Sequence, residues 1–455
     1  MANITGISIN SSVALLPTAY SLQEVTITNH SGDQADIRSL VTDFTITESI
    51  YRSSLVLTMN VKDPVNLVEE YQFTGQEKIN VILARKDFGS NDEEIINLNF
   101  YVSEYPLLGK MNNRLQVYSI TGISPFAFIS KLKRISRAYS GNIGDFVKGV
   151  LITDLGVDPK KVIISSAATV SAKFIVPNMN PLDAIFWALR RAYDGSGSPF
   201  YCYQTLNGDI RLDAQTDMAL KQPYREYRDG KFLESDRQND AHIEADYKER
   251  ARRIMTMSSD FRMSKYIAGS NGAYASTTNY LDLSTKTLTR SVFNYENEFK
   301  KMSSVDANEI LSPFFWPEDT SETMANYPNS KINFVSTNHN AFNGVEGNYH
   351  APTLSGSINK AQAHIENLDS IIHDISLAGD FKVNSGIAIN LSISPSIDPE
   401  ATVQNDNSKG DKMQDKFFSG KYVVTAVAHK FSEEYTMDLK IKKDSLPFSF
   451  RTIRI

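Results

Sequence analysis

The chain has 455 residues, of which 47 are basic and 53 acidic, so its formal net charge is −6. At roughly 150 residues per domain, this length predicts about three domains. The negative charge argues against a general attraction to nucleic acid or anionic lipid. The single cysteine, Cys202, excludes an intrachain disulfide. Because no long apolar run or secretion signal is visible, we expect a protein that is made and assembled in the cytoplasm, without stable membrane insertion.

Apolar and polar residues alternate through residues 1–130, which is the pattern of strands buried on one face. A short helix over Val65–Tyr71, capped by Asp63, interrupts the strands. The alternation predicts a first antiparallel β-barrel domain over 1–130. Its clearest strands are Leu55–Val61, Glu77–Leu83 and Leu98–Val102.

Residues 131–222 read as a small α+β domain. An apolar stripe at helical spacing predicts a helix over Ile143–Leu151, and Asn180-Pro181 begins a second one. A hairpin then turns at Asn207-Gly208, the strongest short hairpin signal.

The remaining chain divides into three parts. We expect 223–259 to be a charged connector that contributes to a second barrel, and 260–358 to be an inserted loop-rich domain. A helix and the second β-barrel should occupy 359–455. One helical seam is predicted from the spacing of Ala361, Ile365, Leu368, Ile372 and Ile375. Alternating strands follow over Ile387–Ile393, Tyr422–Ala428 and Tyr435–Ile441.

No catalytic, cofactor-binding or metal-binding constellation is visible, and no phosphate-binding or dinucleotide motif is present. On the predicted helix, His364 and His373 lie on opposite faces, so they cannot share a metal. His429 falls on the face opposite Tyr422, Val424, Ala426 and Ala428, as a solvated or interface strand residue. Cys202 is expected to be a buried strand cysteine. Asp92-Glu93-Glu94 is expected to be a solvated hairpin tip rather than a cation site or a glycosidase carboxylate.

Two basic clusters are candidates for contact with nucleic acid or with an acidic subunit. An exposed linker or helix face is the favoured explanation for both. The clusters are Lys131, Lys133, Arg134 and Arg137, and Lys248, Arg250, Arg252 and Arg253.

Three stretches in this order resemble the central baseplate hub protein of contractile-tailed bacteriophages, which is related to the N-terminal part of type VI secretion spike proteins. The first stretch runs from Phe44 to Ile50, then Ser54 to Asp63 and Gly75 to Val81. The second is Val176–Ile185 with the following hairpin. The third is the helix from Ala361, then Gly379–Val383, Gly386-Ile387 and Ser419–Phe431. Together they cover roughly 60% of the chain, while 260–358 resembles the family less.

The resemblance implies a mainly β fold with α+β parts: two barrels like those of a tail tube, a small α+β domain and an inserted domain. It also implies a homotrimer, in which six similar barrels adapt a hexameric tail tube to a trimeric spike. The implied partners are the tube or tube-initiator protein, the central spike and baseplate wedge proteins, with DNA passing unbound through the lumen. The protein would have no cofactor and would reside in the virion baseplate.

Two other functions stay open at this point. A spike or tail-tip protein that binds host glycans would use aromatic residues of the middle region: Tyr274, Tyr280, Tyr295, Phe314, Phe315 and Trp316. An enzyme such as a cell-wall hydrolase is the less favoured alternative, since catalytic residues need not be adjacent in sequence.

Overall fold

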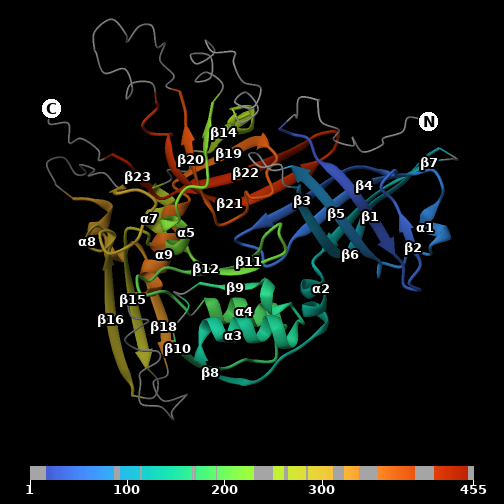
Figure 1. Ribbon diagram of the computed structural model, residues 1–455. Coiled ribbons are helices and arrows are strands. Elements are labelled where there is room, and N and C mark those ends of the chain that lie inside the picture. The colour runs from blue at the N-terminus through green and yellow to red at the C-terminus, as the bar shows by residue number, and fades with distance from the viewer. Residues whose placement is uncertain are drawn as a thin grey trace, which may run out of the picture.

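The computed structural model describes residues 17–86, 93–112, 115–165, 168, 171–190, 192–229, 249–260, 265–282, 285–310, 322–337, 357–394 and 414–448. These residues form a mainly β fold in which antiparallel sheets dominate. Figure 1 shows a long curved sheet across the top of the molecule, a small helical domain below it and a separate sheet at one end.

The first β module, residues 17–123, is a sheet curled around one apolar core. Val25 of β1, Ile46 of β3 and Val81 of β5 all belong to that core, so strands from both ends of the sheet face each other across it. The alternation predicted for this region is confirmed. The apolar side chains of each strand are buried in the shared core, and their burial stabilises the curled sheet. The elements are β1 Ser21–Thr28, β2 Gln34–Asp36, β3 Val41–Ser49, β4 Val56–Asp63, α1 Leu67–Glu70, β5 Lys78–Lys86, β6 Glu93–Asn112 and β7 Leu115–Ile123.

The small α+β domain follows, with its own core. Both predicted helices are present, and the hairpin β11–β12 turns at Gly208, whose φ of +81° suits glycine. The elements are α2 Pro125–Leu132, β8 Ala138–Asn142, α3 Ile143–Gly149, a π-helical turn Val150–Asp154, a 3-10 turn Pro159–Lys161, β9 Val162–Ile164, β10 Ser171–Ile175, α4 Pro181–Leu189, β11 Phe200–Gln204, β12 Ile210–Ala214 and α5 Gln215–Leu220.

The second β module is assembled from segments far apart in the sequence. Its core joins Tyr227, Ile375 and Leu439. The strands are β13 Glu226–Arg228, β14 Thr256–Asp260, β19 Ile371–Ala378, β20 Ala388–Ser392, β21 Gly420–Phe431, β22 Tyr435–Lys443 and β23 Ser445–Leu446.

The insert lies between β14 and β19 and carries a three-stranded sheet in the order β16-β15-β18. Helix α9 packs on one face of this sheet. The elements are α7 Lys265–Ser270, β15 Ala275–Asp282, β16 Thr287–Asn294, α8 Tyr295–Phe299, β17 Asn308–Glu309, 3-10 turns Met324–Asn326 and Pro328–Ser330, β18 Ile332–Thr337 and α9 Ser357–Leu368.

Two predictions for the C-terminal part are wrong. The expected seam helix ends at Leu368, and Ile372 and Ile375 lie on strand β19. Strand β21 contains a bulge between Val424 and Ala426, which shifts the alternation by one residue. Val427 is therefore in the core together with His429, while Ala426 and Ala428 lie on the opposite face.

Candidate functional site

The two β modules share one strand order. The first module runs β3-β4-β7-β6-β5-β1, and the second runs β14-β19-β22-β21-β20-β13. In both, a long hairpin (β6–β7 or β21–β22) lies at the centre, and its first strand also pairs with the strand before it in the chain. One difference is that β13 pairs in parallel with β20, whereas β1 and β5 are antiparallel.

The modules meet by direct strand pairing. Strand β21 is antiparallel to β3 from Ala426 opposite Ser49 to Phe431 opposite Phe44. The fourth strand of the second module, β21, thus lies beside the first strand of the first module, β3, and a single sheet extends through both modules (Figure 1).

On the core side, aromatic packing and a buried acid hold this junction. The rings of Phe44 and Phe431 stack with centroids 4.7 Å apart, and Phe431 stacks on Tyr435 at 4.4 Å. His429 Nδ1 lies 2.8 Å from the Tyr435 hydroxyl, and its Nε2 lies 4.0 Å from the carboxylate of Glu48. All of these side chains are buried.

Glu48 connects three parts of the fold. Its carboxylate accepts hydrogen bonds from the backbone N–H of Leu206, at 2.6 Å, and of Ser385, at 2.5 Å. Leu206 lies in the β11–β12 turn of the small domain, and Ser385 lies in the loop between β19 and β20. A carboxylate that accepts backbone donors away from water is a strong, directional contact, so Glu48 fixes both segments against β3.

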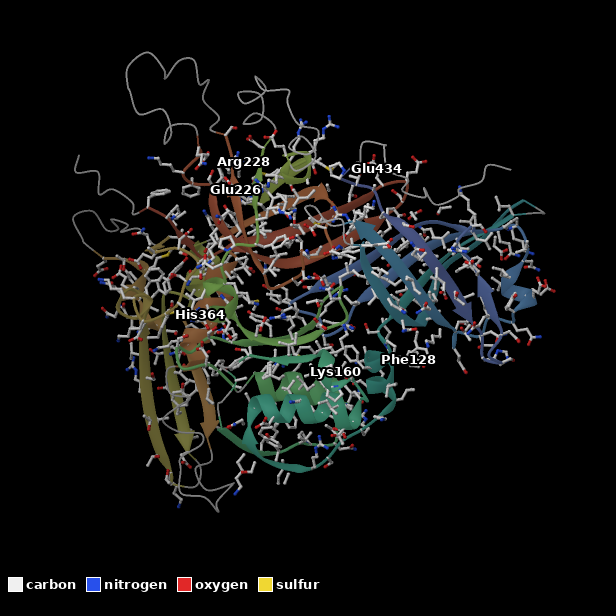
Figure 2. All side chains as sticks on the ribbon, in the orientation of Figure 1. Phe128, Lys160, Glu226, Arg228, His364 and Glu434 are labelled. Carbon is white, nitrogen blue, oxygen red and sulfur yellow. The ribbon has the colours of Figure 1, made fainter. Side chains whose placement is uncertain are left out.

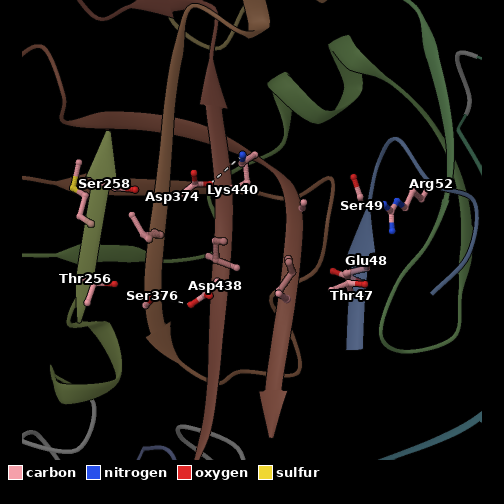
Figure 3. Close-up of a pocket in the computed structure, with 16 residues that line it drawn as sticks. Thr47, Glu48, Ser49, Arg52, Thr256, Ser258, Asp374, Ser376, Asp438 and Lys440 are labelled. Carbon is pink, nitrogen blue, oxygen red and sulfur yellow. Dashed lines mark hydrogen bonds and ion pairs between the residues drawn. The ribbon is translucent and has the colours of Figure 1, made fainter. Parts of the chain in front are cut away.

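The other side of the same sheet is a polar, hollowed surface (Figure 3). We call it the polar face. A hollow of about 630 Å³ follows strands β14, β19, β22, β21 and β3. Side chains from five strands therefore make one surface that belongs to both modules. Its lining includes Thr256, Ser258, Asp374, Ser376, Ala426, Ala428, Asp438, Lys440, Thr47 and Ser49.

Two lysine–aspartate ion pairs lie on the polar face. Lys440 lies 3.5 Å from Asp374, and Lys430 pairs with Asp438, which also accepts a 2.6 Å hydrogen bond from Ser376. The polar character continues onto the first module, where Asn60 donates to Asp43 at 2.8 Å. Arg52 also lines the hollow, so the charged side chains named here are three basic (Lys430, Lys440 and Arg52) and three acidic (Asp43, Asp374 and Asp438).

Both ends of this run of strands are open in the described part of the chain. Strand β14 pairs with β19 on one side alone. The second half of β6, Glu104–Asn112, pairs with β7 but has no partner on its other edge among the described strands. An unpaired edge offers backbone donors and acceptors to another strand.

The structure separates the histidines and buries the cysteine. His364, on α9, lies toward the small domain (Figure 2), while His373 is on β19, so the helical spacing argument does not apply to them. Burial lowers the pKa of each to about 4. His429 is fully buried, which corrects the expectation of a solvated strand residue. Cys202 is buried as predicted, and burial raises the pKa of its thiol to about 12.

The first basic cluster contacts its own domain. Arg137 pairs with Asp154 at 2.6 Å, Lys133 donates to the Asp154 carbonyl, and Arg134 donates to the Asn178 carbonyl. In the second cluster, Arg252 and Arg253 are exposed, whereas Lys248 lies outside the described residues.

The acidic and aromatic candidates do not form a site. Glu94 pairs with Lys382 at 3.0 Å, bridging the two modules, and Asp92 lies outside the described residues. Tyr274, Tyr280 and Tyr295 are buried and cannot contact a glycan. The other aromatic candidates, Phe314, Phe315 and Trp316, lie outside the described residues. Among the described residues there is no group of three or more metal-ligating side chains, and none of the described helices has the length and apolar character needed to cross a membrane.

Comparisons with known proteins give matches in structure alone. No protein-family model and no curated protein matches the sequence. A tail protein from Neisseria meningitidis MC58 is similar with a TM-score of 0.50 and 10% identity, over 94% of this chain and 98% of that one. The 43 kDa tail protein of prophage MuSo2 from Shewanella oneidensis is similar with a TM-score of 0.50 and 9% identity, over 92% and 98%.

The chain has the fold of phage tail proteins. The family resemblance seen in the sequence is therefore confirmed at the level of the fold. Within this tail-protein fold, the polar face and the two open strand edges are the features that point to assembly.

Proposed function

We propose that this chain is the structural hub of a contractile phage-tail baseplate. Three copies would form a ring that adapts a hexameric tail tube to a trimeric spike. The observation that carries the proposal is the pair of modules with one strand order, placed side by side in each copy. Three such pairs present six similar units around one axis, which satisfies both symmetries.

The contact needed to close the ring already occurs once inside each copy, between its two modules. Within one copy, the fourth strand of the second module, β21, pairs with the first strand of the first module, β3. The equivalent strands left open are the second half of β6 and β14. Pairing the Glu104–Asn112 edge of one copy with β14 of the next repeats the same junction. Each copy then contributes eight strands, β14, β19, β22, β21, β3, β4, β7 and the second half of β6, to one closed wall.

The polar face supplies the channel lining in this arrangement. Serine, threonine and alanine side chains line it together with two lysine–aspartate pairs and Arg52, so its positive charges are largely offset by aspartates. DNA that contacts such a wall releases few counterions and gains little binding energy, so it can pass.

The partners follow from the symmetry. The tube or its initiator would bind one rim, the spike the other, and wedge proteins the periphery, in the virion. The two similar solved tail proteins support a structural role in a tail over an enzymatic one. Burial of the insert tyrosines argues against a glycan-binding role for them.

Light scattering of the purified chain, alone and with its spike, followed by particle imaging, tests the proposal. We expect trimers that appear as rings with a central pore. A chain that stays monomeric even with the spike present would contradict it, and so would clearing of a cell-wall zymogram by the pure protein.

A further inference from the structure

One face of the insert sheet carries several large apolar side chains that are exposed in the described part of the chain. Phe334 of β18 is 76% exposed, and Leu288 and Val292 of β16 are 63% and 56% exposed. The strand register places Val292 level with Ile332, through Thr277, and Leu288 level with Leu281. Residues level across a sheet share a face. We call this side the apolar sheet face after its large apolar residues, Leu281, Leu288, Val292, Ile332 and Phe334. The same register also places the buried Thr277, and Asn279 and Arg290, on this side.

The opposite face of the same sheet is covered within the chain. Thr278 donates a hydrogen bond to Asn359 of α9, and Tyr280 and Ser276 are buried on that side. The two faces therefore differ: α9 covers one, whereas the other leaves five large apolar side chains exposed among the described residues, with Asn279 and Arg290 between them. Large exposed apolar side chains gathered on one face, with polar residues among them, are typical of an interaction surface.

The position of the insert in the strand order indicates what covers that face. The insert connects β14 to β19, and the equivalent connection in the first module is the β3–β4 turn, Ile50–Leu55. That turn packs across the junction between modules. Ile50 N–H donates to the Thr425 carbonyl at 3.0 Å, and the Lys442 ammonium lies 4.9 Å from the centre of the Tyr51 ring.

The junction at β14 is open in a single copy. By the same strand order, the connection that leaves β14 packs against whichever module pairs with β14. In the proposed ring that module belongs to the neighbouring copy. Figure 1 agrees with this placement, since the insert sheet lies at the opposite end of the molecule from the first module, and a head-to-tail ring brings these two ends together.

We propose that the apolar sheet face of the insert docks on a second copy of this chain, beside the β14 junction. The contact rests on the proposed trimer and adds an apolar belt outside the strand-paired wall. Because strand edges pair through backbone groups that any sequence supplies, the belt would provide the specificity and much of the apolar burial that keeps the copies together.

The test compares the assembly of the full chain with that of a Leu288→Ser/Phe334→Ser variant by mass photometry over a dilution series. Both side chains are exposed in the single chain, so the variant should fold normally, as circular dichroism will check. We expect the concentration for half assembly to rise at least about tenfold. Thr289→Ser, an exposed position that alternates onto the other face of β16, is the matched control and should leave it unchanged.

The outcomes separate the two proposals. A wild-type trimer with an unaffected Leu288→Ser/Phe334→Ser variant would overturn the docking contact and leave the hub intact. A variant that trimerises normally but no longer joins wedge proteins would assign the face to another partner and also overturn it. A wild-type chain that stays monomeric with its spike would overturn the hub, and the docking contact with it. If the double variant misfolds, the single variant Ile332→Ser decides by the same measurement.

Discussion

Glu48 occupies a position in β3 that the alternation reserves for apolar side chains. Phe44, Ile46 and Ile50 share its phase and are buried beside it. An acid in the buried phase of a strand needs hydrogen-bond donors, and Glu48 finds them in the backbone of Leu206 and Ser385. This stretch carries part of the family resemblance, but the resemblance implies no role for the acid. The break in the alternation was the signal that could have found it.

Glu48→Gln should weaken the association of the three segments that meet at this carboxylate. The amide offers one acceptor and places an N–H₂ against backbone donors, so we expect the free energy of unfolding to fall by about 2 kcal/mol. Urea titration measures it. Glu433→Gln, at an exposed turn position, is the control and should change little. Equal stability of the two variants would contradict the role given to Glu48.

Gly386 is a second position at which the surrounding structure determines the residue type. Its φ is +79°, and an added Cβ would lie 1.9 Å from the Tyr203 hydroxyl of the small domain. Gly386→Ala should therefore destabilise the chain by at least about 2 kcal/mol. Gly149→Ala, in a helical conformation with nothing within 4 Å, should be neutral or stabilising. Thermal unfolding of both variants checks the contrast, and matching losses would refute it.

At the scale of elements, the sequence predicts those strands and helices whose position depends on a local residue pattern. Most strands of the first module and the helices α3 and α4 follow from periodicity and turn residues. The boundary between α9 and β19 does not, because Leu368, Ile372 and Ile375 fit a helical spacing by coincidence while pairing with β14 and β22 decides the strand. The β21 bulge is equally hidden, since a one-residue register shift leaves no mark in an apolar run.

Hydrogen exchange tests the open edges as elements. When three copies assemble, outward backbone amides of β14 and of Glu104–Asn112 should become protected, because new strand pairing would sequester them. The β3–β21 junction is the internal control, since it is paired already in one copy and should change little. Comparing exchange below and above the assembly concentration gives the result. Equal exchange of β14 in both states would rule out closure through that edge.

At the scale of the whole molecule, the main finding is that the two modules share one strand order, which no local sequence pattern predicts. The insert interrupts the second module between β14 and β19, so its segments are not contiguous, and the small domain separates the modules. The order of resembling stretches predicted the fold class correctly. The polar face could not be predicted, because its residues come from five strands of both modules and meet only in the folded sheet.

A lysine on the polar face tests its assignment as the channel lining. Thr47→Lys would place three added charges around the proposed pore, and we expect the trimer to bind DNA at least about tenfold more tightly at low salt, with the gain lost as salt rises. Filter binding measures this. Ser31→Lys, at an exposed turn, is the control. Identical DNA affinity for both lysine variants would place Thr47 away from the pore.

The pairing of β3 with β21 also determines when, during synthesis, the shared sheet can form. Strand β3 leaves the ribosome well before its partner β21, because Phe44 and Phe431, which pair, are almost four hundred residues apart in the chain. During that interval the β3 edge is exposed to other nascent chains, and a bare edge invites wrong association. We therefore expect the shared sheet to close only after β21 and β22 have been synthesised, and until then the edge of β3 depends on other protection against wrong association.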